Sequence, residues 1–170
     1  MATLIKKHLT RPFLNDGTSA NPLWVQIKKA VEFTRAMNPT TEERDYIADE
    51  MPTTEVTQYK PSESFSITAY KGEPDFDLFY SLYKARAIGD DAKREFLLVS
   101  LFDKVTVGTT DYYYAEKCGA TITVNEFNFS DSSITIDINE NGTPAIGYVT
   151  ITDGVPSFTE GDMPTPSPST

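Results

Sequence analysis

A cluster of acidic side chains is the strongest candidate in this sequence for a catalytic or metal-binding site. Six of them lie in "TTEERDYIADEMPTTEVTQYKPS", residues 40–62, and these are Glu42, Glu43, Asp45, Asp49, Glu50 and Glu55. Carboxylates at this density could bind calcium or work as a general acid and base. A calcium loop needs a glycine-permitted turn, and this stretch has no glycine. A hydrolase pair needs a rigid cleft, whereas this stretch is an insertion between two expected strands. We therefore expect no metal ion and no catalytic carboxylate here.

Other reactive residue types are scarce. His8 and Cys118 are the only histidine and the only cysteine of the chain. A Ser–His–Asp site would have to be built on His8, and a structural zinc site needs several Cys or His ligands at fixed spacing. We interpret His8 as an exposed polar residue and Cys118 as a small, partly buried strand residue. The sequence thus predicts a protein that is not an enzyme and needs no cofactor.

Length and charge limit the functional classes. The 170 residues suffice for one domain with a real core, and a hydrophobic content of 39% is typical of globular proteins. A formal net charge of −10 argues against binding of free nucleic acid, because such binding depends on neutralising phosphates. We expect no secretory signal and no membrane-spanning helix, and hence folding in the cytoplasm.

The first half of the chain is expected to hold an arm, two strands and a long insertion. Residues 1–22 contain turn residues without periodicity, which is typical of an arm. Apolar and polar residues alternate from Leu23 to Thr34 and again over residues 65–69, which predicts two half-buried strands that pair. Residues 35–61 would then project from the hairpin of these strands. So long a connection usually carries function or disorder.

One helix is expected, over residues 74–88. Pro74 suits its first turn, and Gly89 offers a stop. An aromatic stripe at helical spacing is far more typical of a face packed on a sheet than of a ligand pocket. The stripe consists of Phe76, Phe79, Tyr80 and Tyr83.

Strands are expected in the remainder, up to residue 153. The nearly continuous apolar run "REFLLVSLF" is typical of a strand covered on both faces. Near Asn125 the apolar residues change from one face of the expected strand to the other, which indicates a bulge. The dipeptide Asn141–Gly142 predicts a tight hairpin turn. The proline-rich residues 154–170 are expected to be disordered. The predicted fold class is mainly β: an antiparallel β-sandwich or barrel over residues 23–153, with one packed α-helix and a long inter-strand loop.

The insertion also carries apolar side chains, which a solvated charged loop does not explain. Tyr46, Ile47 and Met51 lie among the acids. Apolar residues repeated along an exposed arm favour a partner surface, so we interpret the segment as an intermolecular docking arm. Its predicted subunit-interface residues are Glu43, Arg44, Tyr46, Ile47, Asp49, Glu50 and Met51.

The same segment resembles a known family. "NPTTEERDYIADEMPTTEVTQYKPSESFSI", from Asn38 to Ile67, is similar to the corresponding part of the major tail proteins (tail tube proteins) of long-tailed siphophages and prophages, especially those of Gram-positive hosts. "YIADE" at 46–50 and "YKPS" at 59–62 carry the resemblance. The order of elements fits from Leu23 to Ile151.

That resemblance implies a structural virion protein that is made in the host cytoplasm. Family members form six-membered rings that stack into a hollow tail tube, a conduit for DNA ejection. Strands of all subunits join into an inner barrel, and the long loop reaches neighbouring subunits or rings. The implied partners are further copies of the chain, tail-tip and tail-terminator proteins, and a tape measure protein inside the tube. A negative lumen would repel phosphates, so DNA could pass without specific binding.

Strand parity indicates which residues could line such a channel. In "SSITIDIN" the isoleucines alternate with polar residues, so the isoleucines should enter the core. The opposite face carries Thr135, Asp137 and Asn139. These side chains would face the lumen or the outside, and the resemblance favours the lumen.

A second functional class stays open, that of a monomeric β-sandwich binding module for carbohydrate or surface recognition. Tyr112, Tyr113 and Tyr114 could stack on sugars, although consecutive tyrosines in a strand more often divide between its two faces. Such a module stays small, whereas a tube protein forms rings or filaments at raised concentration.

Overall fold

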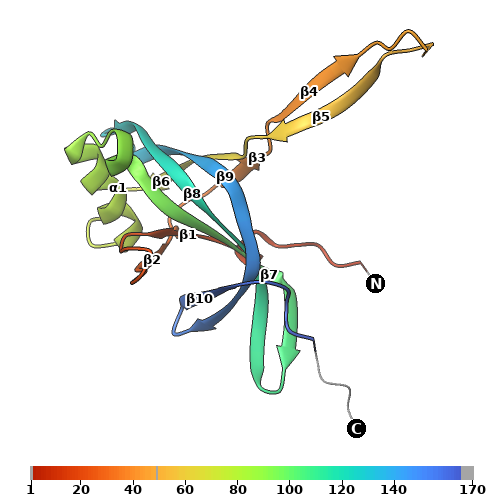
Figure 1. Cartoon of the computed structure of the whole chain (residues 1–170). Coiled ribbons are helices and arrows are strands. Elements are labelled where there is room, and N and C mark those ends of the chain that lie inside the picture. The colour runs from red at the N-terminus through yellow and green to blue at the C-terminus, as the bar shows by residue number, and fades with distance from the viewer. Residues whose placement is uncertain (1, 49, 166–170) are drawn as a thin grey trace.

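The computed structural model describes residues 2–48 and 50–165 of the chain. Its strands are β1 (Thr10–Asn15), β2 (Trp24–Gln26), β3 (Thr34–Ala36), β4 (Pro39–Arg44), β5 (Thr53–Tyr59), β6 (Ser62–Thr68), β7 (Lys93–Val107), β8 (Thr110–Asn128), β9 (Ser133–Thr152) and β10 (Val155–Glu160). The helices are α1 (Pro74–Ala85) and the short 3₁₀ turns η1 (Lys7–Leu9) and η2 (Gly89–Ala92). Eight strands form one sheet in the order β2-β1-β7-β8-β9-β6-β3, with β10 also paired to β9 (Figure 1). The strands β4 and β5 form a separate two-stranded sheet.

The predicted fold class is confirmed. The chain is mainly β, its strand pairings are antiparallel, and α1 is the only α-helix of the described residues. This helix begins at the predicted residue but ends at Ala85 instead of residue 88. Arg86 adopts a left-handed conformation with φ 49°, and the N–H of Ala87 donates to the Leu82 carbonyl at 3.2 Å, which closes the helix. None of the described helices is long and apolar enough to cross a membrane.

Two hydrophobic cores lie on opposite faces of the sheet. Phe96 belongs to the larger one, the helix-side core beneath α1, and Leu97 to the smaller one, the distal core near β10. Neighbouring side chains of a strand point to opposite faces, so the apolar run of β7 is covered on both sides, as predicted. The helix-side core also takes in the fully buried Ile134, Ile136 and Ile138 of β9, as their alternation predicted.

Residues 10–15, predicted to belong to an arm, instead form β1 between β2 and β7. Phe13 and Leu14 are almost completely buried, the first in the distal core and the second in the helix-side core. A strand covered on both faces shows no polar–apolar alternation, and this one is too short to stand out as an apolar run. The sequence pattern therefore concealed it.

The single strand predicted from Leu23 to Thr34 is interrupted. Strand β2 ends at Gln26. The N–H of Ile27 still donates to the Pro12 carbonyl of β1 at 3.0 Å, and the chain then turns toward the helix. The N–H groups of Lys28 and Lys29 donate to the buried carboxylate of Asp75 at 2.9 and 3.0 Å. Asp75 also accepts from the N–H of Phe76 at 2.9 Å, so one acid at the start of α1 pins the irregular segment to it.

Strand irregularities match the sequence in one place and differ in another. The bulge predicted near Asn125 is confirmed by a register shift between Val124 and Glu126. The hairpin predicted at Asn141–Gly142 is wrong, because β9 continues through these residues. Gly142 has φ 74°, and the pairing of β9 with β8 shifts register after Asn141. Asn-Gly thus supplies the positive φ of a bulge instead of a turn.

The segment after Gly154, predicted to be disordered, begins with an ordered strand. Residues 155–160 form β10, which pairs along the C-terminal half of β9, and Phe158 packs on the distal core. Pro156 does not prevent the pairing, because β10 contacts only one neighbouring strand. Residues 166–170 of the predicted tail lie outside the described residues.

Candidate functional site

The hairpin of β4 and β5 projects away from the body of the molecule (Figure 1). Every residue of both strands is exposed, although the strands pair from Pro39↔Tyr59 to Arg44↔Thr53. A two-stranded hairpin without a covered face is at best marginally stable in water. The long insertion predicted for residues 35–61 thus contains the β4–β5 hairpin. No residue of these two strands is buried in the chain's own core.

The predicted interface residues gather on this hairpin. Ile47 and Met51 have exposed fractions of 108% and 77%, and Tyr46 of 50%. Glu43, Arg44 and Glu50 are exposed beside them, while Asp49 lies outside the described residues. Arg44 pairs with the exposed Glu42 at 3.1 Å and Glu55 at 3.4 Å, contacts that solvent weakens. Their role in subunit contacts stays a prediction.

A buried ionic cluster stands at the root of the hairpin. Arg35 of β3 donates to both oxygens of Glu140 at 2.7 and 2.9 Å and lies 2.8 Å from Glu116. The Glu140 side chain is 1% exposed. Burial opposes the charge of Arg35, but hydrogen bonds to Glu140 and Glu116 prevail and raise its pKa further above the usual value. The forked pair thus joins the strand before the hairpin to β9.

Glu63 is the fourth member of this root cluster and follows the hairpin directly on β6. Its side chain is fully buried, and neither carboxyl oxygen forms a hydrogen bond with the described residues. Arg35 Nε lies 3.4 Å away but already donates to Glu140. Burial, and then the Glu140 carboxylate, raise the pKa of Glu63 to about 9. This shift favours the protonated form of the Glu63 carboxyl at neutral pH.

The root cluster was not predicted from the sequence, although one signal was present. Glu63 shares the parity of Phe65 and Ile67, which puts a carboxyl on the buried face of its strand. Cys118 also belongs to the cluster, since its thiol donates to Glu140 Oε2 at 3.5 Å. Burial and the Glu140 carboxylate raise the pKa of Cys118, so the thiol stays protonated and weakly reactive.

The predicted lumen residues lie together on a polar face of the sheet, opposite the helix-side core. Across the strands, Thr135, Asp137 and Asn139 pair with Ser66, Ser64 and Ser62 of β6. Thr135 shares a 2.8 Å hydrogen bond with Ser66, and Asn125 donates to Asp137. This face is rich in hydroxyl and amide groups. Whether it lines a channel stays a prediction.

The three tyrosines of the alternative reading divide between the faces of β8. Tyr113 packs on the distal core, whereas Tyr112 contacts Tyr148 edge to face at 5.5 Å. Tyr114 donates to Glu116 at 3.0 Å, at the edge of the root cluster. The three rings therefore form no common platform for a sugar.

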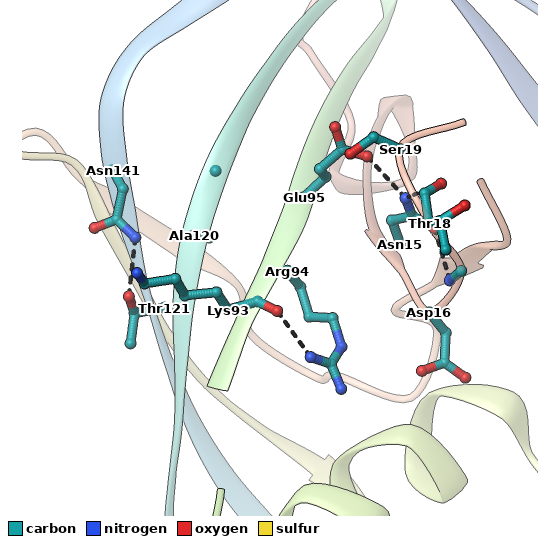
Figure 2. Close-up of a pocket in the computed structure, with 12 residues that line it drawn as sticks. Asn15, Asp16, Thr18, Ser19, Lys93, Arg94, Glu95, Ala120, Thr121 and Asn141 are labelled. Atoms are coloured by element: carbon teal, nitrogen blue, oxygen red, sulfur yellow. Dashed lines mark hydrogen bonds between the residues drawn. The ribbon is translucent and has the colours of Figure 1, made fainter. Parts of the chain in front are cut away.

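A polar pocket of about 860 Å³ lies beside the 16–23 loop (Figure 2). Asn15 donates to Glu95 at 2.7 Å and to the Thr18 carbonyl at 3.2 Å, and Asn141 donates to Thr121 at 2.9 Å. The Asn15 side chain also accepts from the N–H groups of Gly17 and Leu23 at 2.8 and 2.9 Å, so it holds the loop together. No group of three His, Cys, Asp or Glu side chains suited to a metal ion occurs among residues 2–48 and 50–165.

Comparisons with known proteins give distant structural likeness only. No protein-family model and no curated protein matches the chain. A chain of the anti-feeding prophage baseplate, solved by cryo-electron microscopy and 6-fold symmetrised, is similar with a TM-score of 0.46 and 8% sequence identity. The match covers 84% of this chain and 95% of that one. This likeness is too weak to support a conclusion about function.

Proposed function

We propose that the chain is a structural virion protein that polymerises as stacked hexameric rings into a phage tail tube, a conduit for DNA ejection. Its partners are further copies of itself, the proteins at the two ends of the tube, and a tape measure protein inside. The role is structural instead of catalytic, and the protein works in the virion tail after assembly in the host cytoplasm.

The projecting hairpin carries the proposal. It keeps Ile47 and Met51 in solvent on two strands that bury no residue in their own chain. Such a hairpin gains stability when a partner covers it. The resemblance of the same segment to tail tube proteins supplies the kind of partner, a neighbouring copy.

The polar sheet face supports the second half of the proposal, passage of DNA. Hydroxyl and amide groups with the single carboxylate of Asp137 offer phosphates no cation along the paired part of β6 and β9. A net charge of −10 acts in the same direction. A channel lined in this way would let DNA slide without holding it.

Negative-stain microscopy and sedimentation of the concentrated protein test the proposal. We expect rings or tubes with a central channel. Ile47→Ser should shift sedimentation toward the monomer, whereas Ile88→Ser, which removes a side chain that is 81% exposed on the body, should not. Wild-type protein that stays monomeric, even with tail-initiation components present, would reject the tube role.

A further inference from the structure

A groove of about 500 Å³ lies between η1, β1 and the irregular segment after β2. Its floor is largely apolar and includes Ile27, Phe33 and Leu98. Its rim is basic and includes Lys7, Arg11 and Lys28. The exposed Val31 also lines it, with an exposed fraction of 73%. The groove thus combines an apolar surface with a basic border.

The charge of this groove contrasts with the rest of the protein. The chain carries 25 acidic residues against 15 basic ones, yet no Asp or Glu lines the groove. Lys7, Arg11 and Lys28 form no ion pair with any described residue, unlike Lys93, Lys104 and Lys117 elsewhere. Such a groove attracts a partner that is acidic and partly apolar.

The β4–β5 hairpin has the complementary chemistry. Ile47 and Met51 are the most exposed of its large apolar side chains, and Glu43 and Glu50 lie close to them in the sequence. The hairpin points away from the body (Figure 1), and no residue of β4 or β5 lines the groove of its own chain. Six strand residues span roughly 20 Å, which is enough to reach a neighbouring molecule.

We propose that this basic groove receives the β4–β5 hairpin of a second copy of the chain. The inference rests on the assembly role proposed above and names the receptor for the arm. Ile47 and Met51 of one copy pack on the apolar floor and Val31 of the next. The hairpin acids face Lys7 and Lys28 on the rim, and burial of the tip supplies the contacts that the isolated hairpin lacks.

Cysteine cross-linking tests the contact directly, since Cys118 is buried. One preparation carries Ile47→Cys and a second carries Val31→Cys. Mixed at an assembling concentration and oxidised, the two should give a disulfide-linked dimer of the two different variants. Ile88→Cys in place of Val31→Cys is the matched control, because Ile88 is equally apolar and exposed but lies outside the groove. Equal cross-linking with both partners would overturn the proposal.

Charge reversal tests the rim. Lys7→Glu with Lys28→Glu should raise the protein concentration for half-maximal assembly at least about tenfold. Adding Glu43→Lys and Glu50→Lys to the same chain should restore most of the loss. Lys71→Glu with Lys84→Glu changes the net charge equally outside the groove and should alter assembly less than about twofold. A loss that is equal in both double variants would contradict the proposal.

The outcomes separate this inference from the tube role. Rings or tubes that form normally with both groove lysines reversed, without cross-linking of Ile47→Cys to Val31→Cys, would refute the groove and leave the tube role standing. Wild-type protein that forms no assemblies would refute both. Cross-linking and rescue together would establish the receptor.

Discussion

The hairpins β4–β5 and β9–β10 have the same local form and opposite relations to the core. In β10, Pro156 is buried and Phe158 lies on the distal core. The packing is so close at Gly147 that a Cβ there would overlap the Thr159 carbonyl oxygen. In β4 and β5 every residue is exposed. The hairpin β9–β10 is thus packed on the hydrophobic core, whereas β4–β5 is attached to the body only at its root and exposes both of its strands.

The root explains how an unsupported hairpin keeps its direction. Asn38 has φ 43° and donates to the Lys60 carbonyl and to Ser62 at 3.0 and 2.8 Å. Just beyond, Arg35 and Glu140 tie the chain to β9. The hairpin is therefore anchored by polar contacts at one end, while its stability against fraying depends on what covers the rest.

Removing β10 should have the largest effect on folding. Truncation after Asp153 uncovers Val149 and removes Phe158 from the distal core, so we expect the free energy of unfolding to fall by about 3 kcal/mol or more. Urea denaturation measures it. Truncation after Asp162 is the control and should change little, because β10 stays in place. Equal stability of both truncated proteins would mean that β10 adds nothing to the fold.

Glu63→Gln should have an intermediate effect, and one that depends on pH. The native state keeps a proton on Glu63 that the unfolded state loses above its ordinary pKa of 4.5, so wild-type stability should fall as pH rises from 4.5 toward 9. Glutamine is neutral at every pH and removes this slope. Unfolding free energies between pH 5 and 7 measure it, below the range in which Cys118 titrates in the unfolded chain.

The exposed Glu42 of the hairpin supplies the control. Glu42→Gln removes a carboxylate whose side chain is 57% exposed, and it should leave the pH slope of wild type unchanged. A Glu63→Gln protein with the wild-type slope would show that Glu63 is ionised in the native state.

Deleting the hairpin should have the smallest effect on folding and a complete effect on assembly. Thr40 and Gln58 face each other across the ladder, so an Asn-Gly turn can join them in place of residues 41–57. The described residues of this segment are exposed, and loop closure varies slowly with length, so we expect a change below about 1 kcal/mol in the free energy of unfolding. Calorimetry and sedimentation measure the two effects. Loss of cooperative unfolding would place the hairpin in the folding unit.

Local patterns were reliable in several elements of which one face meets the core, although the alternation from Leu23 to Thr34 predicted a continuous strand that does not form. Three patterns each separate a core-facing side from a solvent-facing side of one element. They are the alternation in β6 and β9, the aromatic stripe of α1 and the change of face near Asn125. The long insertion and its exposed apolar side chains could also be predicted from the sequence, because that prediction does not depend on which other strands are neighbours. The receptor groove could not be predicted from the sequence, because β1, β7 and the segment after β2 meet there only in the folded chain.

The sequence by itself determined the mainly β class, the helix start at Pro74 and the projecting acidic arm. Tertiary structure decided the rest: that β1 and β10 join the sheet, that Asp75 holds the irregular segment after β2, and that Asn141–Gly142 forms a bulge. It also brought Arg35, Glu63 and Glu140 together from strands distant in sequence. The physical reason is that the spacing of apolar residues along a helix or strand shows which of its faces is buried when only one is. Burial on two faces and the pairing of charges depend instead on which strands become neighbours in the folded chain.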